Sequence, residues 1–146
     1  VVAVRTDSGI QTLADLAGRR VAVQATGKPE SIFLTSDAPG IAQVEAVYSF
    51  STMDEVYACL RKGYADAIAG HENALGLFLA SSPGSYRMLD ETLDVSQLGV
   101  AFQKDTHQEL AQALTQTLAE MEADGTTRAI LERYGLDADR ALGVTP

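Results

Sequence analysis

The sequence has 146 residues, of which 46% are hydrophobic, and its formal net charge at pH 7 is −9. This balance is that of a globular chain with one domain or two small lobes, and the acidic charge argues against nucleic acid or an anionic membrane surface as a partner. No apolar run approaches the roughly 18 residues that a membrane span needs, and the opening stretch VVAVRTDSG lacks the pattern of a signal peptide.

The first third of the chain alternates apolar runs with helix signals. Residues 1–4 and 21–23 are short apolar runs that predict strands. Between them, Thr12 is expected to be the N-cap of a short helix that ends at Gly18. After the second strand comes a glycine turn with Pro29, which suits the first turn of a helix over about 29–35.

The middle of the chain repeats this alternation. Residues 44–48 predict a strand, and Thr52 with a glutamate three residues later forms a capping-box pattern that begins the next helix. Gly63 ends that helix, residues 66–70 predict another strand, and residues 72–79 predict another helix.

In the last third of the chain, the alternation of strands and helices gives way to two predicted strands followed by two predicted helices. Residues 86–89 predict an edge strand and the apolar run 98–102 a further strand. A long helix follows, with one apolar face, and a second helix is expected over about 126–134. The apolar face consists of Leu110, Leu114, Leu118 and Met121. The tail after residue 135 shows no clear pattern.

This order predicts an α/β fold, with a mostly parallel sheet between two layers of helices over roughly residues 6–97. In such sheets, ligands bind at the carboxyl ends of the strands. Those ends are expected at residues 24–27, 48–51 and 69–72, which therefore make up the candidate site.

The sequence contains no GxSxG, Walker or GxGxxG motif. The single cysteine, Cys59, has no partner for a disulfide and fits a buried apolar position. The two histidines lack metal-site spacing, and His107 is expected to lie at the surface. We therefore expect no catalytic residue, no metal and no cofactor.

Four segments, in this order, resemble the amino-acid-binding (family 3) branch of the type 2 periplasmic solute-binding proteins. They are TLADLAGRRVAVQ at 12–24, MDEVYACLRKGYADAIAG at 53–70, LGVAFQKD at 98–105 and LAEMEADGTTRAILERYG at 118–135. The resemblance implies a hinge strand at 1–5, lobe two at 6–97, and a return hinge strand with C-terminal lobe-one helices at 98–146. It also implies that the N-terminal part of lobe one is absent from this sequence.

The resemblance and the strand ends together give candidate ligand-binding residues. The family's lobe-two loop reads Gln-x-Gly-Thr, whereas residues 24–28 here read QATGK, so that Thr26, Gly27 and Lys28 would face an anionic group of the ligand. The family's ammonium-binding aspartate is replaced by His71, with Glu72 next to it. A simple strand–helix turn with a solvated lysine is the structural alternative at the first position, and a favourable first-turn acid is the alternative for Glu72.

The resemblance implies extracytoplasmic, periplasmic binding of a small polar solute, an amino acid or a related organic anion, for ABC import or for signalling. Its partners would be an ABC transporter permease or attached receptor domains. An enzyme of the cyclic-acid dehydratase type, with His71 and Glu72 as general base, and a degenerate sensor or interaction module are the alternatives. We expect the chain alone to bind solute weakly, and its C-terminal helices to pair as a homodimer.

Overall fold

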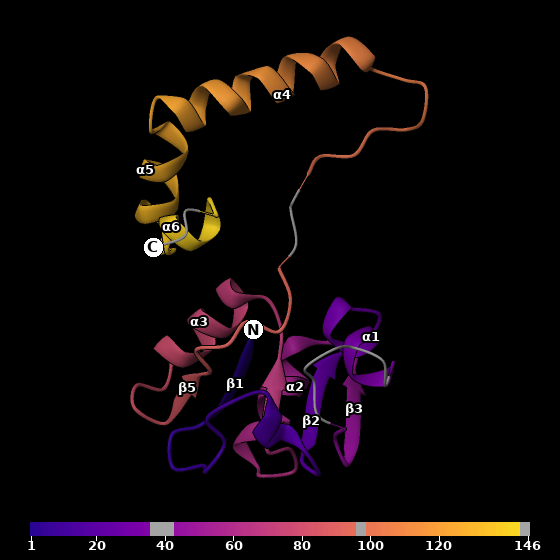
Figure 1. Cartoon of the computed structure of the whole chain (residues 1–146), viewed down its shortest axis with the longest axis vertical. Helices are drawn as coiled ribbons and strands as arrows, with labels where there is room; N and C mark the ends of the chain where they lie inside the picture. Colours follow the sequence, from indigo (N-terminus) through magenta and orange to yellow (C-terminus); the bar gives the residue numbers. More distant parts are fainter. Residues whose placement is uncertain (36–42, 96–98, 144–146) are drawn as a thin grey trace. The chain divides into compact units, whose positions relative to one another are not determined.

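The computed structural model describes residues 1–35, 43–95 and 99–143. The chain forms two compact units, Val1–Ser96 and Gln97–Pro146 (Figure 1). The first is an α/β unit built on a single sheet and the second is helical. Within the described part of the chain, no helix is both long enough and apolar enough to cross a membrane.

The described part of the first unit contains five strands and four helical segments. The strands are β1 (Val2–Arg5), β2 (Arg20–Gln24), β3 (Ala46–Phe50), β4 (Ala67–Ala69) and β5 (Tyr86–Met88). The helices are the 3-10 turn η1 (Ala14–Leu16) and the α-helices α1 (Lys28–Leu34), α2 (Met53–Arg61) and α3 (Glu72–Ala80). The predicted α/β class is confirmed, and α2 and α3 lie within a residue or two of their expected positions.

The strands form one mostly parallel sheet in the order β3-β2-β4-β1-β5. Strand β2 is central to the parallel part and pairs in parallel with both β3 and β4. Strand β1 runs against its two neighbours, β4 and β5, so that β5 points in the same direction as the three parallel strands. As expected, β5 is an edge strand.

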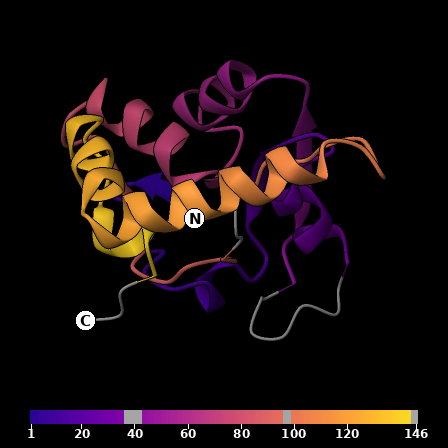
Figure 2. The same ribbon diagram turned by 90° about the horizontal axis from the view of Figure 1, so that it is seen from above.

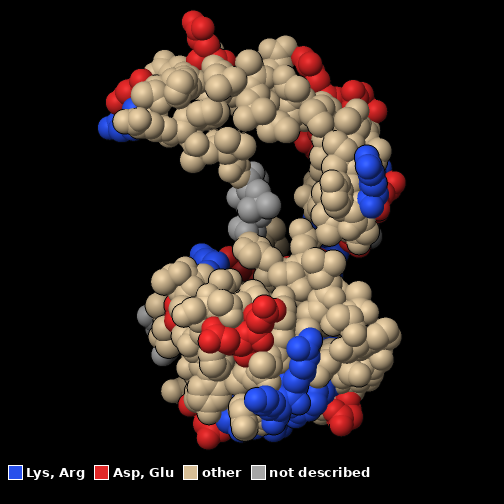
Figure 3. Space-filling model, turned by 180° about the vertical axis from the view of Figure 1, so that it is seen from behind, with Lys and Arg blue, Asp and Glu red and all other residues tan. Residues whose placement is uncertain are grey.

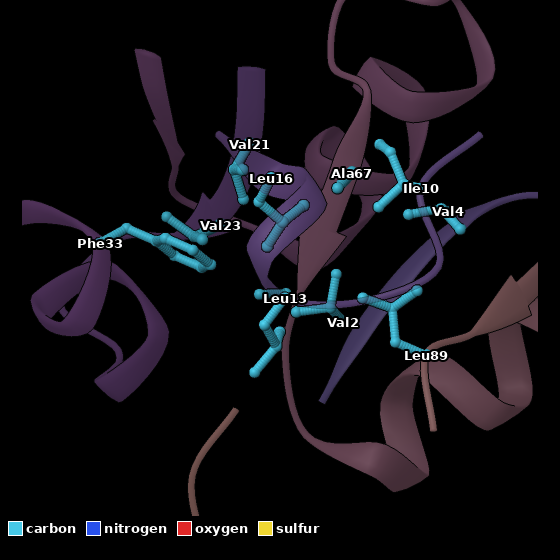
Figure 4. Close-up of a cluster of buried hydrophobic side chains, with 11 residues drawn as sticks. Val2, Val4, Ile10, Leu13, Leu16, Val21, Val23, Phe33, Ala67 and Leu89 are labelled. Atoms are coloured by element: carbon cyan, nitrogen blue, oxygen red, sulfur yellow. The ribbon is translucent and has the colours of Figure 1, made fainter. Parts of the chain in front are cut away.

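Apolar side chains of the strands point alternately to the two faces of the sheet and make one core on each face. On one face, Val21 and Val23 of β2 pack with Leu16 of η1 and Phe33 of α1 (Figure 4). On the other face, Ala22 and Ile68 pack under α2 and α3. The unit thus has the predicted three layers. Cys59 is buried in the second core, in the apolar role expected for it.

Local sequence signals explain where the helices begin. Helix α2 starts with a complete capping box, in which the Thr52 hydroxyl accepts from the Glu55 N–H and the Glu55 carboxylate accepts from the Thr52 N–H. Gly27 is the N-cap of α1, and Pro29 lies in its first turn. Gly63, at a φ of 72°, follows the end of α2 in the left-handed conformation that glycine adopts easily.

Two expected elements differ from the structure. The helix predicted from Thr12 is only a 3-10 turn with Leu13 at its N-cap. The reason is that the Asp15 carboxylate accepts the N–H groups of both Gln11 and Thr12, which holds these residues in a turn before the helix. The strand predicted at 98–102 is absent over residues 99–102, since no described strand offers those residues a ladder of backbone hydrogen bonds. Its first residue lies outside the described part.

The second unit consists of α4 (Gln108–Ala123), α5 (Thr126–Arg133) and α6 (Ala138–Ala141). Figures 1 and 2 show α4 and α5 meeting at an angle, at Gly125, whose φ is 83°. Arg128 of α5 reaches Asp139 of α6 at 2.6 Å, which connects the last two helices. Helix α6 was not predicted, because four residues are too few to show a helical period.

Candidate ligand-binding site

The candidate site lies at the carboxyl edge of the parallel strands. In the sheet, Val23 of β2 is opposite Ala69 of β4, and Gln24 is opposite Phe50 of β3. The three strands therefore end side by side, and the segments that follow them begin at a single edge (Figure 1). Thr26–Lys28 and His71 thus follow strands that end at one edge of the sheet, whereas the prediction that they face one shared cleft and bind a ligand stays a prediction.

The loop between β2 and α1 has an unusual backbone at Thr26. Its φ is 61°, a left-handed conformation that residues other than glycine adopt rarely. The next residue, Gly27, is extended, and a Cβ there would lie 3.2 Å from the carbonyl oxygen of Gln24. The threonine is thus held in a strained turn, and the glycine allows the loop to double back tightly on the end of β2.

An unpredicted carboxylate, that of Glu30, lies inside this loop. Its Oε2 accepts the Thr26 N–H at 2.6 Å, and the side chain of Ser49, near the end of β3, acts on the pKa of the same carboxylate. The Ser49 side chain first, and then the bond from the Thr26 N–H, lower the pKa of Glu30 below its usual value. Sequence analysis missed Glu30 because glutamate in a first helical turn is common and is usually exposed to solvent.

Lys28 is two-thirds exposed, and its Nζ lies 3.7 Å from the Asp94 carboxylate. This surface ion pair gives little stability, because water screens both charges. The lysine is therefore free to exchange Asp94 for another anion at small cost. Asp94 was not predicted as its partner because the two residues are distant in the sequence.

The second candidate pair follows β4. His71 is the N-cap of α3, is exposed, and makes no side-chain cap to the helix. Glu72, the first residue of α3, is half-buried. Just before them, Gly70 packs closely, since a Cβ there would lie 3.2 Å from the Met53 side chain. This contact fixes where the chain leaves the sheet and turns into α3.

The opposite, amino edge of the same strands is closed by an ion pair. Arg20 of β2 donates to both carboxylate oxygens of Asp66, at 2.8 and 3.0 Å, and its Nη2 also donates to the Gly63 carbonyl. Arg5 lies beside the same turn. Figure 3 shows basic side chains gathered low on the first unit in that view. Arg20 and Asp66 thus pair at this edge, whereas Lys28 and Glu72 at the carboxyl edge lie in the first turns of α1 and α3.

No group of three metal-ligating side chains occurs among the described residues. The site offers backbone N–H groups, hydroxyls, a lysine, an imidazole and the carboxylates of Glu30, Glu72 and Asp94. Such a set can bind a small solute through hydrogen bonds and charge, which is the recognition chemistry of a polar-ligand site. His107 is exposed in the other unit, as expected, and the centroid of its ring lies 6.1 Å from that of Phe102.

Comparison with known proteins identifies the class to which this fold and edge belong. A family model described as "ABC transporter, phosphonate, periplasmic substrate-binding protein" matches residues 1–141. The class is therefore that of the periplasmic substrate-binding proteins of ABC transporters. Within it, this chain belongs to the family that bears that phosphonate description.

Curated relatives and solved structures agree on the class. The histidine-binding periplasmic protein of Salmonella typhimurium is 31% identical over 140 residues, which are 90% of this chain and 52% of that protein. The glutamine-binding protein of Geobacillus stearothermophilus is 29% identical over 103 residues, which are 70% of this chain and 37% of that protein. The structure of an ancestral arginine-binding protein bound to glutamine matches with a TM-score of 0.70 and 26% identity, over 91% of this chain and 57% of that one.

The resemblance to the amino-acid-binding branch of the type 2 periplasmic solute-binding proteins is confirmed by these relatives. All three are binding proteins by name, and the enzyme alternative finds no support among them. This chain spans about half the length, or less, of the curated relatives it matches.

Proposed function

We propose that this chain supplies one solute-binding lobe of a periplasmic protein that captures a small polar solute, an amino acid or a related organic anion, for ABC import. The observation that carries the proposal is the register of the parallel strands, which ends β2, β3 and β4 at one edge. The names of the relatives, which refer to histidine, glutamine and arginine, and the phosphonate description of the family support this solute class.

The proposed ligand-binding residues divide by charge. Thr26, Gly27 and Lys28 would face the solute's anionic group, a carboxylate or a phosphonate, with N–H groups and an ammonium. His71 and Glu72 would face its cationic or polar end, Glu72 as a carboxylate and His71 as a hydrogen-bonding imidazole. The amino acids and the phosphonate of the related proteins share the anionic group, which makes the β2–α1 loop the common element of recognition.

Partners and location follow from the class. The solute-loaded protein would dock on an ABC transporter permease from the periplasmic side, with signalling through attached receptor domains as the second outcome. Binding would shift an equilibrium between open and closed arrangements of two lobes. The hinge and lobe boundaries proposed from the sequence, at 1–5, 6–97 and 98–146, assign residues to this motion.

A titration of the ¹⁵N-labelled chain followed by NMR tests the proposed site. The probes are L-histidine, L-glutamine, L-arginine and methylphosphonate, each raised to millimolar concentration because one lobe covers only part of a solute. We expect at least one probe to shift the amide signals of Thr26–Lys28 and of residues 71–72. Lys28→Gln, which removes the ammonium proposed to face the anion, should weaken that response, and Lys62→Gln at the end of α2 serves as the control. Shifts elsewhere only, or with no probe, would contradict the proposal.

A further proposal concerns self-association through α4. Of its predicted apolar stripe, Leu110 is 55% exposed and Leu118 is 48% exposed, and no residue of the helix is buried. Burial of such side chains is favourable by about 1.5–3 kcal/mol each, so that a second copy would be a suitable cover. Light scattering at micromolar concentration should show a dimer that Leu110→Lys and Leu118→Lys abolish. A monomeric wild-type chain would contradict pairing.

A further inference from the structure

Glu30 occupies the place where the solute's anionic group is expected. Its carboxylate accepts the Thr26 N–H at 2.6 Å, and Thr26 follows β2, whose neighbour β3 carries Ser49. Neither Thr26 nor Ser49 is buried. Both groups are therefore accessible to an incoming solute, but in this structure an internal carboxylate already accepts the Thr26 N–H.

Two other side chains near the loop also bond within the chain. The Thr26 hydroxyl donates to the Ala25 carbonyl at 2.6 Å, and the Gln24 amide donates to the Ser51 carbonyl at 3.2 Å. Lys28 has Asp94 as its neighbour. Within the loop, the carboxylate bonded to the Thr26 N–H is that of Glu30.

The strained backbone of Thr26 fits this role. A left-handed φ at a threonine persists only where surrounding contacts hold it. The short bond from its N–H to Glu30 is such a contact, and it spans one turn of chain, from residue 26 to residue 30. An anion that takes over the N–H can hold the same backbone, so that exchange of one carboxylate for another does not require the loop to refold.

We propose that Glu30 is an internal competitor of the solute, a carboxylate that holds the β2–α1 loop in the solute-free state and is displaced when the solute's anionic group binds Thr26. The inference rests on the proposed function, which assigns Thr26 to the solute. Glu30 would then be a determinant of affinity. The net binding free energy of each solute would be the difference between the interaction of its own anionic group with the loop and the interaction of the Glu30 carboxylate that it replaces. Solutes with the stronger anionic acceptor are favoured.

Glu30→Gln is the variant that tests the competition. Glutamine keeps an oxygen acceptor for Thr26 and the length of the side chain, but it lacks the charge that strengthens the bond. The matched control is Glu45→Gln, which removes the same charge from the same unit just before β3, at the amino edge of the sheet. Affinities for methylphosphonate and L-glutamine are measured by NMR titration, and stability by thermal unfolding.

We expect Glu30→Gln to tighten binding by roughly threefold to tenfold, because the bond that must be broken is weaker without charge. The same variant should lower the thermal stability slightly, so that affinity and stability move in opposite directions. Ser49→Ala, which removes the hydroxyl that also acts on the Glu30 carboxylate, gives an independent check and should make that carboxylate easier to displace. Glu45→Gln should leave the affinity unchanged within error.

Two results would overturn the proposal and separate it from the function on which it rests. If Glu30→Gln and Ser49→Ala both weaken binding while Lys28→Gln also weakens it, the solute binds at the loop and Glu30 supports that site instead of competing for it. If no variant and no probe gives a response at Thr26, the proposed function fails and the competitor role fails with it.

Discussion

The two units of this chain bury their apolar side chains very differently. Among the described residues, every buried hydrophobic side chain except Ala138 belongs to the first unit. The two longest helices of the second unit, α4 and α5, contain no buried residue, although both carry apolar side chains. One unit therefore has a core of its own, and the other presents apolar helix faces that its own residues do not cover.

This difference indicates where stability comes from in each unit. A sheet covered on both faces gains free energy from burial within the unit and can be expected to fold alone. Three helices with exposed Leu110, Leu118 and Ile130 gain little in this way and depend on helix propensity, capping and external contacts. Substitutions chosen in pairs, one in each unit, measure how independent the two units are.

The largest expected effect comes from the core of the first unit. Leu60 on α2 is fully buried, so Leu60→Ala removes apolar contacts and leaves a cavity, and should cost about 2–5 kcal/mol of unfolding free energy. Its partner in the comparison is Leu118→Ala on α4, which should cost less than about 1 kcal/mol because the side chain is half exposed. Amide hydrogen exchange, measured separately over 53–61 and 108–123, distinguishes the two units.

The outcome of that pair decides whether the units unfold together. If Leu60→Ala accelerates exchange in the first unit only, the units are independent. Equal acceleration in α4 would mean that the two unfold as a single cooperative body and would contradict the comparison.

A smaller effect is expected at the amino edge of the sheet. Asp66→Asn keeps the shape of the side chain but weakens the three bonds that Arg20 donates to it, two from the guanidinium and one from the backbone N–H. It should cost about 1–2 kcal/mol at pH 7, between the values for exposed ion pairs and for bonds to buried charges. The Arg20 side-chain bonds hold the pKa of Asp66 below its usual 3.8, against the opposing effect of desolvation.

The pH dependence of this effect has a definite sign. Because the folded-state pKa of Asp66 is lowered, its contribution is fully present above about pH 4 and is lost as the pH falls through the folded-state value, below 3.8. Denaturant unfolding at several pH values should therefore show wild type and Asp66→Asn converging in acid. Asp7→Asn is the control, since Asp7 is almost fully exposed and 3.9 Å from Arg5. A constant difference down to pH 2 would exclude the charge as the cause.

Sequence patterns predicted the first unit well because its signals are local. The capping box at Thr52 and Glu55 placed the start of α2, and the apolar runs placed the strands within about two residues, since a strand needs only a short alternating or apolar segment. The parallel alternation also predicted that the segments after β2 and β4 share an edge. The strand expected at 98–102 failed because an apolar run does not reveal whether a pairing strand exists beside it.

The candidate site was predictable in position but not in its internal contacts. The strand ends identified Thr26 and His71, whereas the Glu30–Thr26 bond depends on a left-handed backbone at a threonine, which no sequence pattern indicates. The Lys28–Asp94 pair joins residues that come together only after the chain folds. Contacts of this kind are set by the tertiary structure, so sequence analysis could name the residues that face the edge but not their partners.

The smallest expected effect is at the helix caps and gives the finest test of the comparison. Thr52→Ala removes the hydroxyl that accepts the Glu55 N–H at 3.4 Å and should cost about 1 kcal/mol, because one N–H of the first turn of α2 loses its partner. In the second unit, Asp137 caps α6 by accepting the Arg140 N–H at 3.1 Å, and Asp137→Ala removes that bond.

If each unit is stabilised by its own contacts, Thr52→Ala should speed hydrogen exchange in α2 and leave α6 unchanged, and Asp137→Ala should do the reverse. Because α2 packs on a buried sheet, its amides should exchange only when a larger part of the unit opens, whereas the amides of α6 need only a local opening. Loss of one capping bond should therefore leave exchange slow in α2 and fast in α6. Equal exchange rates in α2 and α6 of the wild-type chain would show that the core of the first unit gives α2 no added protection.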